Sequence, residues 1–428
     1  MNKNRILSVG AGLVLSVLTA SAQLTLEECH RLAAEHYPLV KRYQLIEQTA
    51  GYTLANISKG WLPQLSFDAQ ATLQSDVMTL PDALETMLAG TGQNVKGLKK
   101  DQYRVGLNVN QVVYDGGSIK ASRKSAMAES DVEVKKNEVE LYQLRERVNN
   151  LFFGVLLTEE KIRLNENLQE LLLDNCRKME AMVKGGTAML SDQDAIRAEY
   201  LNARQQHTEL SSTKDCFLRM LEAFIGRRVS SGLEKPKADA PLDDTPDRPE
   251  LRWMDARTRL IDAKEKQLDA SLRPRLSLFA QGYYGYPGYD MFGDMFSHDW
   301  TLNGMVGLKL SWNLSGFYTH KNDRRRLSVK RAEVENAREV FLFNNRLQSI
   351  ENHSTIRRYQ LVMAEDEEII SLRSSVRKAA EEKLSHGVID VNDLLQEINR
   401  ENNARIALST HEIEMLKSIY ELKYTLNK

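Results

Sequence analysis

The distribution of proline and glycine constrains the fold of this chain most strongly. All nine prolines lie between Pro38 and Pro287, and none occurs between Pro81 and Pro236. Within the proline-free spans, segment 118–184 holds one glycine, Gly154, and segment 317–386 holds none. Proline and glycine are the main breakers of helices. Each segment is therefore predicted to form a very long helix, about 100 Å at 1.5 Å per residue.

The sequence consists of two related halves. Early matches between the halves are 211 residues apart and later ones 201, and the difference falls between two predicted strands, where a loop can change length. The matched pairs include Pro38 with Pro249, Pro63 with Pro274, Gly186 with Gly387, and Asp192 with Asp393. We therefore expect two tandem structural repeats, residues 23–226 and 248–428, joined by an irregular connector at 227–247.

The N-terminal segment 1–22 is predicted to be a secretory signal peptide. Lys3 and Arg5 precede an apolar run, and Ala20-Ser21-Ala22 ends the segment. The three cysteines do not form a disulfide framework, and we interpret Cys29, Cys176 and Cys216 as small buried hydrophobic residues. The 58 basic residues nearly balance the 59 acidic residues, so charge gives no indication of nucleic-acid binding.

Each repeat contains a pair of segments in which apolar and polar residues alternate. The predicted hairpins are 64–114 and 275–315, and their strands are about as long as the 9–11 residues of a tilted membrane strand. The apolar positions include Leu65, Phe67, Ala69, Ala71 and Leu73 in one strand, and Val306, Leu308, Leu310 and Trp312 in another. A half-buried hairpin on a soluble core is the alternative. We favour membrane strands, because the remainder of each repeat is helical and offers no second sheet to cover the apolar face.

Four strands cannot close a barrel, and open strand edges are not tolerated in lipid. We therefore expect several copies of the chain to share one barrel. The long helices 118–184 and 317–386 follow the hairpins, and the return helices 191–226 and 392–428 follow glycine turns. Apolar residues in the first long helix recur every seven residues, as in a coiled coil: Val134, Leu141, Val148, Val155 and Ile162. A spectrin-like rod would share this pattern but would not explain the strands.

The order of these elements resembles the TolC-like outer-membrane efflux protein family (outer membrane factors), from Leu24 to about Leu426. The motifs that carry the resemblance are Leu24-Thr25-Leu26-Glu27-Glu28-Cys29, Leu62-Pro63-x-Leu65, Tyr114-Asp115-Gly116-Gly117, Gly186-x5-Asp192 and Gly387-x5-Asp393. The resemblance implies a mixed α and β fold, in which a homotrimer shares a twelve-stranded transmembrane β-barrel continuous with a periplasmic helical barrel. It also implies docking to a periplasmic adaptor protein and an inner-membrane transporter.

The turns between long and return helices are the candidate functional residues. Asp192 and Asp393 are equally spaced from their glycines, so a threefold assembly is expected to bring each into a ring of carboxylates that favours cations. The alternative is helix capping, with Ser191 or Asn392 as the N-cap. By alignment with the family, Gln396 occupies a second acidic position, and Leu384 and Ile389 occupy locking positions. Candidate adaptor contacts are Gly185, Gly186, Thr187 and Ala188 in one turn, and Gly387, Val388, Ile389 and Asp390 in the other.

No motif indicates an enzyme, a metal site or a cofactor. The fragment His411-Glu412-Ile413-Glu414-Met415 lacks the second histidine of a zinc-protease helix. The basic run Arg324-Arg325-Arg326 is interpreted as a solvated helix face, with contact to anionic lipid headgroups as the alternative. The sequence thus favours a passive outer-membrane exit duct. A trimeric coiled-coil surface protein, structural or adhesive and anchored by a barrel, is the alternative.

Overall fold

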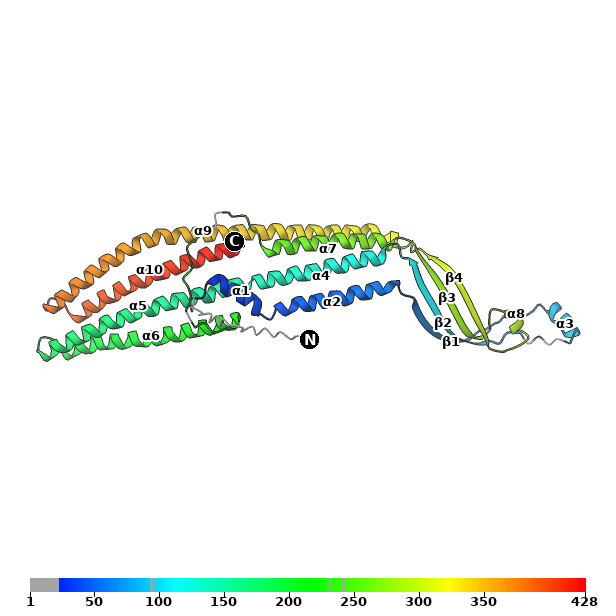
Figure 1. Ribbon diagram of the computed structural model, residues 1–428, viewed down its shortest axis with the longest axis horizontal. Coiled ribbons are helices and arrows are strands. Elements are labelled where there is room, and N and C mark those ends of the chain that lie inside the picture. The colour runs from blue at the N-terminus through cyan, green and yellow to red at the C-terminus, as the bar shows by residue number, and fades with distance from the viewer. Residues whose placement is uncertain (1–22, 93–94, 96, 231, 241–242) are drawn as a thin grey trace, which may run out of the picture. The chain divides into compact units, whose positions relative to one another are not determined.

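The computed structural model describes residues 23–92, 95, 97–230, 232–240 and 243–428 (Figure 1). The predicted signal peptide 1–22 lies outside the described residues. The elements are α1 (Leu26–His36), α2 (Val40–Ser58), a 3₁₀ turn (Lys59–Trp61), β1 (Gln64–Leu73), α3 (Asp82–Gly90), β2 (Asp101–Tyr114), α4 (Ser118–Tyr142), α5 (Leu144–Lys184), α6 (Leu190–Ile225), α7 (Pro249–Ser271), β3 (Arg275–Tyr286), α8 (Met291–Asp294), β4 (Thr301–Ser311), α9 (Gly316–Ser385) and α10 (Val391–Leu426).

The chain divides into two compact units that do not follow the two sequence repeats. The sheet unit comprises Lys41–Val139 and Pro249–Phe341, and the hairpin unit comprises the chain up to Val40, Glu140–Arg248 and Leu342–Lys428. Each unit draws on both halves of the sequence. Compact packing therefore brings together segments from both halves of the sequence.

The sheet unit contains one antiparallel sheet in the order β1-β2-β3-β4. Its register pairs Leu65 with Val109 and Ala280 with Val306, so the apolar residues of all four strands share one face. That face is open: Phe67 is 71% exposed and Val306 72% exposed. Other exposed apolar residues on it are Leu65, Leu73, Val105, Leu107, Leu302, Leu308 and Leu310. The alternation predicted these strands closely, and none of the described residues forms a core that covers the apolar face.

The opposite face of the sheet is polar. The side chain of Asn108 donates a hydrogen bond to the carboxylate of Asp68 on the neighbouring strand. On the same face, the guanidinium of Arg104 lies 4.3 Å from the ring centroid of Tyr283. Because successive residues of a strand point to opposite faces, one side of this sheet suits lipid and the other suits water.

The motif Tyr114-Asp115-Gly116-Gly117 turns β2 into α4. The Asp115 carboxylate accepts hydrogen bonds from the backbone amides of Gly117 at 2.8 Å and of Ile119 at 2.5 Å. Gly116 has φ +69°, and a Cβ atom there would lie 2.6 Å from the Cβ of Arg273. Only glycine satisfies both the backbone conformation and the close approach.

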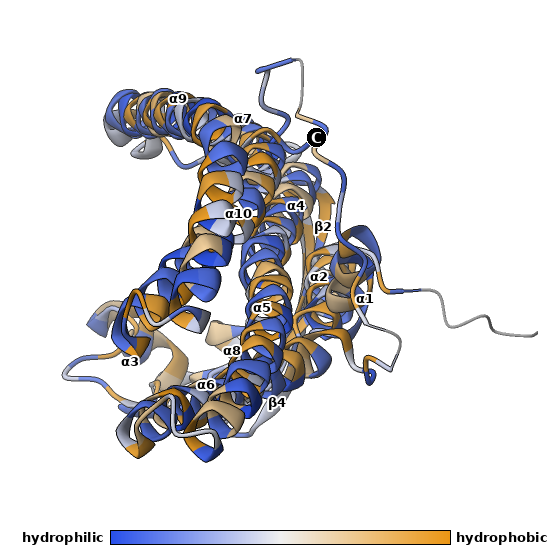
Figure 2. Ribbon diagram, turned by 90° about the vertical axis from the view of Figure 1, so that its left-hand side faces the viewer, coloured by the Kyte–Doolittle hydropathy of each residue, from blue (hydrophilic) through white to orange (hydrophobic). Residues whose placement is uncertain are grey.

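The long helices differ in detail from their prediction. The segment 118–184 is divided at Gln143 into α4 and α5, although Gln143 keeps helical torsion angles, whereas α9 runs unbroken. Val148 and Val155 of the predicted seam are buried, but so are Leu151, Phe152 and Phe153. The buried face of α5 is therefore broader than a narrow coiled-coil seam. Along the helices, hydrophobic and hydrophilic residues are interspersed (Figure 2).

The interpretation of all three cysteines as buried residues is wrong. Cys29 is buried in the core of the hairpin unit, Cys176 is partly buried, and Cys216 is exposed on α6. Burial raises the pKa of the Cys29 thiol to about 12. None of the described helices is both long enough and apolar enough to cross a membrane.

Candidate functional site

The hairpin unit contains two helical hairpins, α5–α6 and α9–α10. The turns at their tips have similar backbone torsion angles and the same hydrogen-bond pattern. Gly186 and Gly387 have φ +76° and +69°. The amide of Thr187 donates to the carbonyl of Met182 at 3.0 Å, and the amide of Val388 donates to the carbonyl of Lys383 at 2.9 Å. This bonding pattern ends each helix at a left-handed glycine. The repeated glycines thus have a local structural cause.

The two tip aspartates are used differently. The N-cap of α6 is Met189, whose backbone amide donates to the Asp192 carboxylate at 3.0 Å. The N-cap of α10 is Asp390, whose carboxylate accepts from the backbone amide of Asp393 at 2.9 Å. The predicted N-caps Ser191 and Asn392 are therefore wrong.

The Asp393 carboxylate is left free by this arrangement. Asp393 is exposed, and in the described part of the chain no hydrogen bond or ion pair to its side chain is found. Gln396, one turn farther along α10, is also exposed. Leu384 and Ile389 pack against the apolar core below the tips. The two predicted locking positions therefore hold partly buried apolar side chains in this chain.

The tips combine exposed backbone with exposed apolar side chains. Gly185, Gly186 and Thr187 are exposed in the first tip, while Ala188 packs toward the core. In the second tip Gly387 and Val388 are exposed, and Asp390 is occupied in capping α10. Met189 and Leu190 add two exposed apolar side chains to the first tip. The tips therefore offer a small mixed surface for contact with another protein.

Comparison with solved structures shows what fold this is. No protein-family model and no curated protein matches the sequence. Among solved structures, the outer membrane protein VceC of Vibrio cholerae is 13% identical with a TM-score of 0.67, and the match covers 94% of this chain and 95% of VceC. The Campylobacter jejuni CmeC outer membrane channel is 13% identical with a TM-score of 0.65, covering 94% and 85%. The open state of the Neisseria gonorrhoeae MtrE outer membrane channel is 14% identical with a TM-score of 0.65, covering 94% and 88%.

This chain has the fold of outer-membrane channels. The resemblance to the TolC-like family inferred from the sequence motifs is confirmed at the level of the fold. At these identities the likeness carries no information about individual side chains, so the sites of this channel fold must be assigned from its own contacts.

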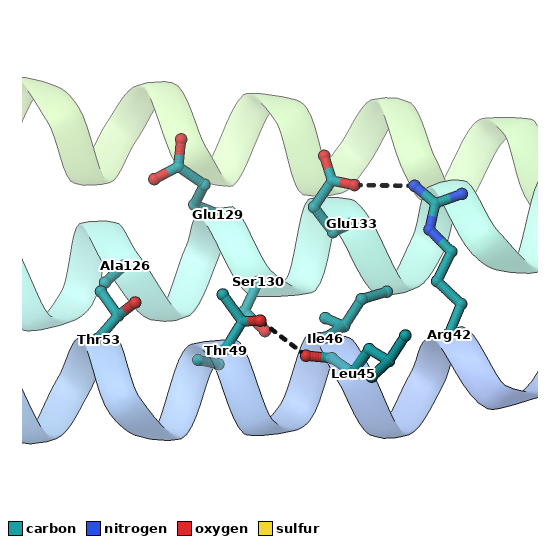
Figure 3. Close-up of a pocket in the computed structure, with 10 residues that line it drawn as sticks. Arg42, Leu45, Ile46, Thr49, Thr53, Ala126, Glu129, Ser130 and Glu133 are labelled. Carbon is teal, nitrogen blue, oxygen red and sulfur yellow. Dashed lines mark hydrogen bonds and ion pairs between the residues drawn. The ribbon is translucent and has the colours of Figure 1, made fainter.

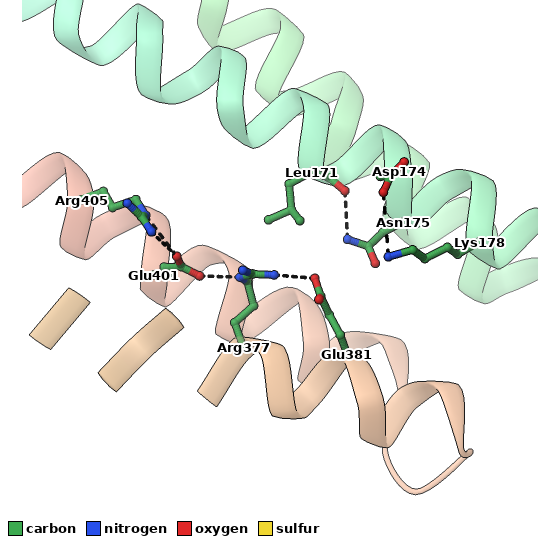
Figure 4. Close-up of polar contacts among 8 residues, drawn as sticks. All are labelled: Leu171, Asp174, Asn175, Lys178, Arg377, Glu381, Glu401 and Arg405. Atoms are coloured by element: carbon green, nitrogen blue, oxygen red, sulfur yellow. Dashed lines mark hydrogen bonds and ion pairs between the residues drawn. The ribbon is translucent and has the colours of Figure 1, made fainter. Parts of the chain in front are cut away.

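An ionic network joins the two helices of the second hairpin (Figure 4). Arg377 lies 2.5 Å from both Glu401 and Glu381, and Arg405 lies 2.7 Å from Glu401. The side chains of Arg377 and Glu401 are only 12% and 7% exposed. Burial alone would raise the pKa of the Glu401 carboxyl, but the hydrogen bonds from Arg405 and Arg377 outweigh burial and lower it.

Sequence reasoning missed this network. Its signal was present as charged residues at helical spacing in both segments: Arg373, Arg377 and Glu381, then Glu397, Glu401 and Arg405. At positions 201 residues earlier, Cys176 and Tyr200 replace Arg377 and Glu401, so the first hairpin has no equivalent pair. A cleft of about 300 Å³ lies beside the network, between α5, α9 and α10.

A second groove lies in the sheet unit, between α2 and α4 (Figure 3). Its volume is about 420 Å³, and small or apolar side chains such as Thr49, Ala50 and Ala126 line most of it. Arg42 and Glu133 form an ion pair of 3.2 Å at one end. The groove brings together no set of groups capable of acid–base or nucleophilic chemistry.

The remaining polar candidates show no catalytic or metal-binding arrangement. Within the described ranges, no three His, Cys, Asp or Glu residues are gathered as metal ligands. His411 is paired with Asp366 at 2.6 Å, between α10 and α9. Arg324, Arg325 and Arg326 are exposed on the first part of α9, where Arg326 pairs with Asp323 at 3.2 Å.

Proposed function

We propose that this protein is the outer-membrane exit duct of an export system, either a tripartite efflux system or a type I secretion system. It conducts substrates passively through the outer membrane. The observation that carries the proposal is the four-stranded sheet with a continuous exposed apolar face and a polar opposite face. Water cannot stabilise such a large apolar surface, whereas the hydrocarbon of a membrane can.

The edges of the sheet support an oligomer. Strands β1 and β4 each pair on one side only within the described chain. Unpaired backbone groups are not tolerated in lipid, so these edges must pair with other copies. Three copies supply twelve strands, which is the homotrimer implied by the resemblance.

The surface of α9 supports the same conclusion for the helices. Within the hairpin unit, α9 carries an exposed apolar stripe made of two groups at three- and four-residue spacing, 343–350 and 369–376, with Leu361 between them. The exposed residues are Phe343, Leu347, Ile350, Leu361, Ile369, Leu372 and Val376. An exposed apolar side of a long helix is suited to packing against a neighbouring helix. We propose that another subunit covers this stripe and completes a helical barrel in the periplasm.

The ends of the sheet are suited to the two interfaces of a membrane. The Trp300 ring lies 6.0 Å from that of Tyr103 and 5.4 Å from that of Tyr284, which forms an aromatic cluster at the loop end. Such residues are enriched at headgroup level. At the other end, β4 leads into α9 and its exposed Arg324–Arg326 run, which forms a solvated helix face next to the membrane in this proposal.

The hairpin tips form the far end of the duct in this proposal. The unpaired Asp393 carboxylates of three subunits form the constriction, with Asp192 and Gln396 nearby. A periplasmic adaptor protein contacts Gly185–Ala188 and Gly387–Asp390, and an inner-membrane transporter supplies the energy. No feature supports a nucleic-acid partner, because basic residues are not clustered with aromatic ones.

The test is conductance of the purified mature protein in planar bilayers, together with its mass in detergent. A conducting oligomer is expected. A monomer that is soluble without detergent would refute the proposal. Protease added to intact cells distinguishes the surface-protein alternative, because only external helices would be cut.

A further inference from the structure

The two loops that join the strands lie at the same end of the sheet but leave it from opposite edges. The loop of residues 74–100 follows the edge strand β1, and the loop of residues 287–300 precedes the other edge strand β4. The pairs Leu73–Asp101 and Gly285–Thr301 close the two hairpins at this end. Any ring in which β4 of one copy meets β1 of the next therefore brings the second loop of one copy beside the first loop of the other.

The bases of the two loops are fixed to each other within one chain. Leu98, Tyr286 and Met295 form a small buried core. The amide of Lys99 donates to the Tyr286 hydroxyl at 3.1 Å, and His298 lies 2.8 Å from the carbonyl of Gly97. The bases of the two loops therefore form one packed unit at this end of the sheet.

The first loop projects helix α3, whose residues are exposed except for the partly buried Leu88. Met87 is 71% exposed, and Leu84, on the same side of the helix, is also exposed. An isolated helix of nine residues is marginal in water. This helix also lacks a side-chain N-cap, because Pro81 occupies that position. A partner that covers Leu84 and Met87 would supply the missing stabilisation.

The second loop projects a matching apolar patch at the other edge. Phe292 is 57% exposed and Met291 is also exposed. Of the neighbouring acids, Asp294 is buried and accepts from the amide of Gly288 at 2.5 Å. Asp290 is exposed and accepts from the amide of Gly293 at 3.0 Å as the N-cap of α8. Met291 and Phe292 therefore form the apolar part of the patch, with the Asp290 cap beside them.

We propose that α3 of one subunit docks through Leu84 and Met87 onto Met291 and Phe292 of the next subunit. The proposal rests on the shared barrel of the proposed function, because the strand edges place these two loops together. The contact is head-to-tail, so it repeats around the ring and closes with it. Lipid is the poorer partner, because α3 carries Asp82 and Glu85 and no basic residue, and anionic headgroups repel such a helix. The result is a belt of contacts around the outer mouth of the duct.

Cross-linking of the full mature chain in detergent tests this contact. In a background of Cys29→Ala, Cys176→Ala and Cys216→Ser, the pair Met87→Cys and Phe292→Cys is treated with a short bis-maleimide. Covalent dimers and trimers are expected on denaturing gels. The matched control pairs Met87→Cys with Met127→Cys, an equally exposed position on α4, and is expected to remain monomeric on the gel.

The mass of the protein before cross-linking distinguishes a failure of the loop contact from a failure of the proposed oligomeric duct. An oligomer that gives no 87–292 product overturns the loop contact and leaves the duct intact. A monomer overturns both. Product from Met87→Cys alone would show that α3 contacts another α3, and would also overturn the assignment.

Alanine variants keep the test independent of the cysteine background. Met87→Ala and Phe292→Ala are each expected to lower the temperature at which the oligomer dissociates, and their combination to lower it by less than the sum. Met127→Ala is expected to leave that temperature unchanged. An unchanged dissociation temperature in both loop variants would refute the contact.

Discussion

Asp192 and Asp393 illustrate how two residues at the same sequence spacing acquire different roles. Met189 has no side-chain oxygen, so the Asp192 carboxylate itself accepts the free amide at the start of α6. At the start of α10 the Asp390 carboxylate serves as the cap, and Asp393 is released. Whether the aspartate caps its helix is thus decided by the residue three positions earlier.

The first prediction concerns ion selectivity. Asp393→Ala removes a ring of exposed carboxylates and is expected to abolish most of the cation preference of the conducting oligomer. Asp192→Asn removes the equivalent charge of the first tip, although its amide oxygen can still accept the hydrogen bond from Met189. It is expected to reduce the cation preference less, because the Asp192 carboxylate is already committed to the cap. Reversal potentials in a salt gradient measure the cation selectivity of both variants. Equal cation selectivity of the wild type and Asp393→Ala would refute the role of Asp393.

The second prediction concerns thiol reactivity. With its pKa raised to about 12, the buried Cys29 is expected to react at pH 8 at least about a thousandfold more slowly than an exposed thiol of ordinary pKa. Cys216 is exposed and should be alkylated first. Mass spectrometry after a short maleimide pulse measures the order of labelling, and a denatured sample is the control. Fast labelling of Cys29 in the folded protein would contradict its burial.

The third prediction concerns the ionic network of the second hairpin. Arg377→Met leaves Glu401 buried with one partner fewer, and breaking such a pair costs about 3–5 kcal/mol. The oligomer should therefore denature at lower temperature. Cys176→Ala, at the equivalent position of the first hairpin, is the control and should cost less. Calorimetry measures the denaturation temperature of both variants. An equal fall in this temperature would show that the network adds no stability.

The pH dependence of the same network has a defined sign. The pKa of Glu401 is lower in the folded chain than in the unfolded chain. Its stabilisation is therefore complete above the ordinary glutamate pKa of about 4.3 and is lost as pH falls through the lowered value. A Glu401→Gln variant should lack this acid-dependent loss, while the wild type shows it.

At the scale of elements, the strands were the most predictable part of the structure. Their alternation has a period of two, and the same residues that alternate in the sequence lie on the exposed face, from Leu65 in β1 to Leu310 in β4. The tip glycines were predictable because a left-handed turn requires them. The N-caps were not, because Met189 is not a residue type that signals a cap. The network around Arg377 depends on which helices face each other, which a single sequence does not specify.

The fourth prediction tests which face of the sheet meets lipid. Val306→Arg places a charge on the apolar face near the middle of β4 and is expected to destabilise the inserted protein by about 2–4 kcal/mol. Ser66→Arg lies on the polar face, opposite Asn108, and should insert normally. Insertion into lipid vesicles, followed by protease protection, measures the difference. Equal insertion of the two variants would contradict the assignment of the faces.

At the scale of the whole molecule, three surfaces of the chain are incomplete. Among the residues that the structure describes, nothing covers the apolar face of the sheet, pairs with the outer sides of its two edge strands, or covers the apolar stripe of α9. Lipid can cover the first surface only. The strand edges and the helix stripe both require protein. The strand edges and the α9 stripe belong to the same chain. Association of identical copies would therefore pair the edges and cover the stripe at the same time.

The fifth prediction separates the contribution of the helices from that of the sheet. Leu347→Glu and Leu361→Glu each place a charge in the exposed stripe of α9 without touching the strands. Burying a leucine contributes about 1.5–3 kcal/mol, and each trimer contains three copies of the contact. Each variant is therefore expected to form a much less stable trimer, and the mass in detergent as a function of protein concentration measures this. Gln348→Glu, a neighbouring exposed position, is the control for added charge. If the leucine variants assemble as well as this control, the strands alone hold the subunits together and the stripe faces something other than another copy.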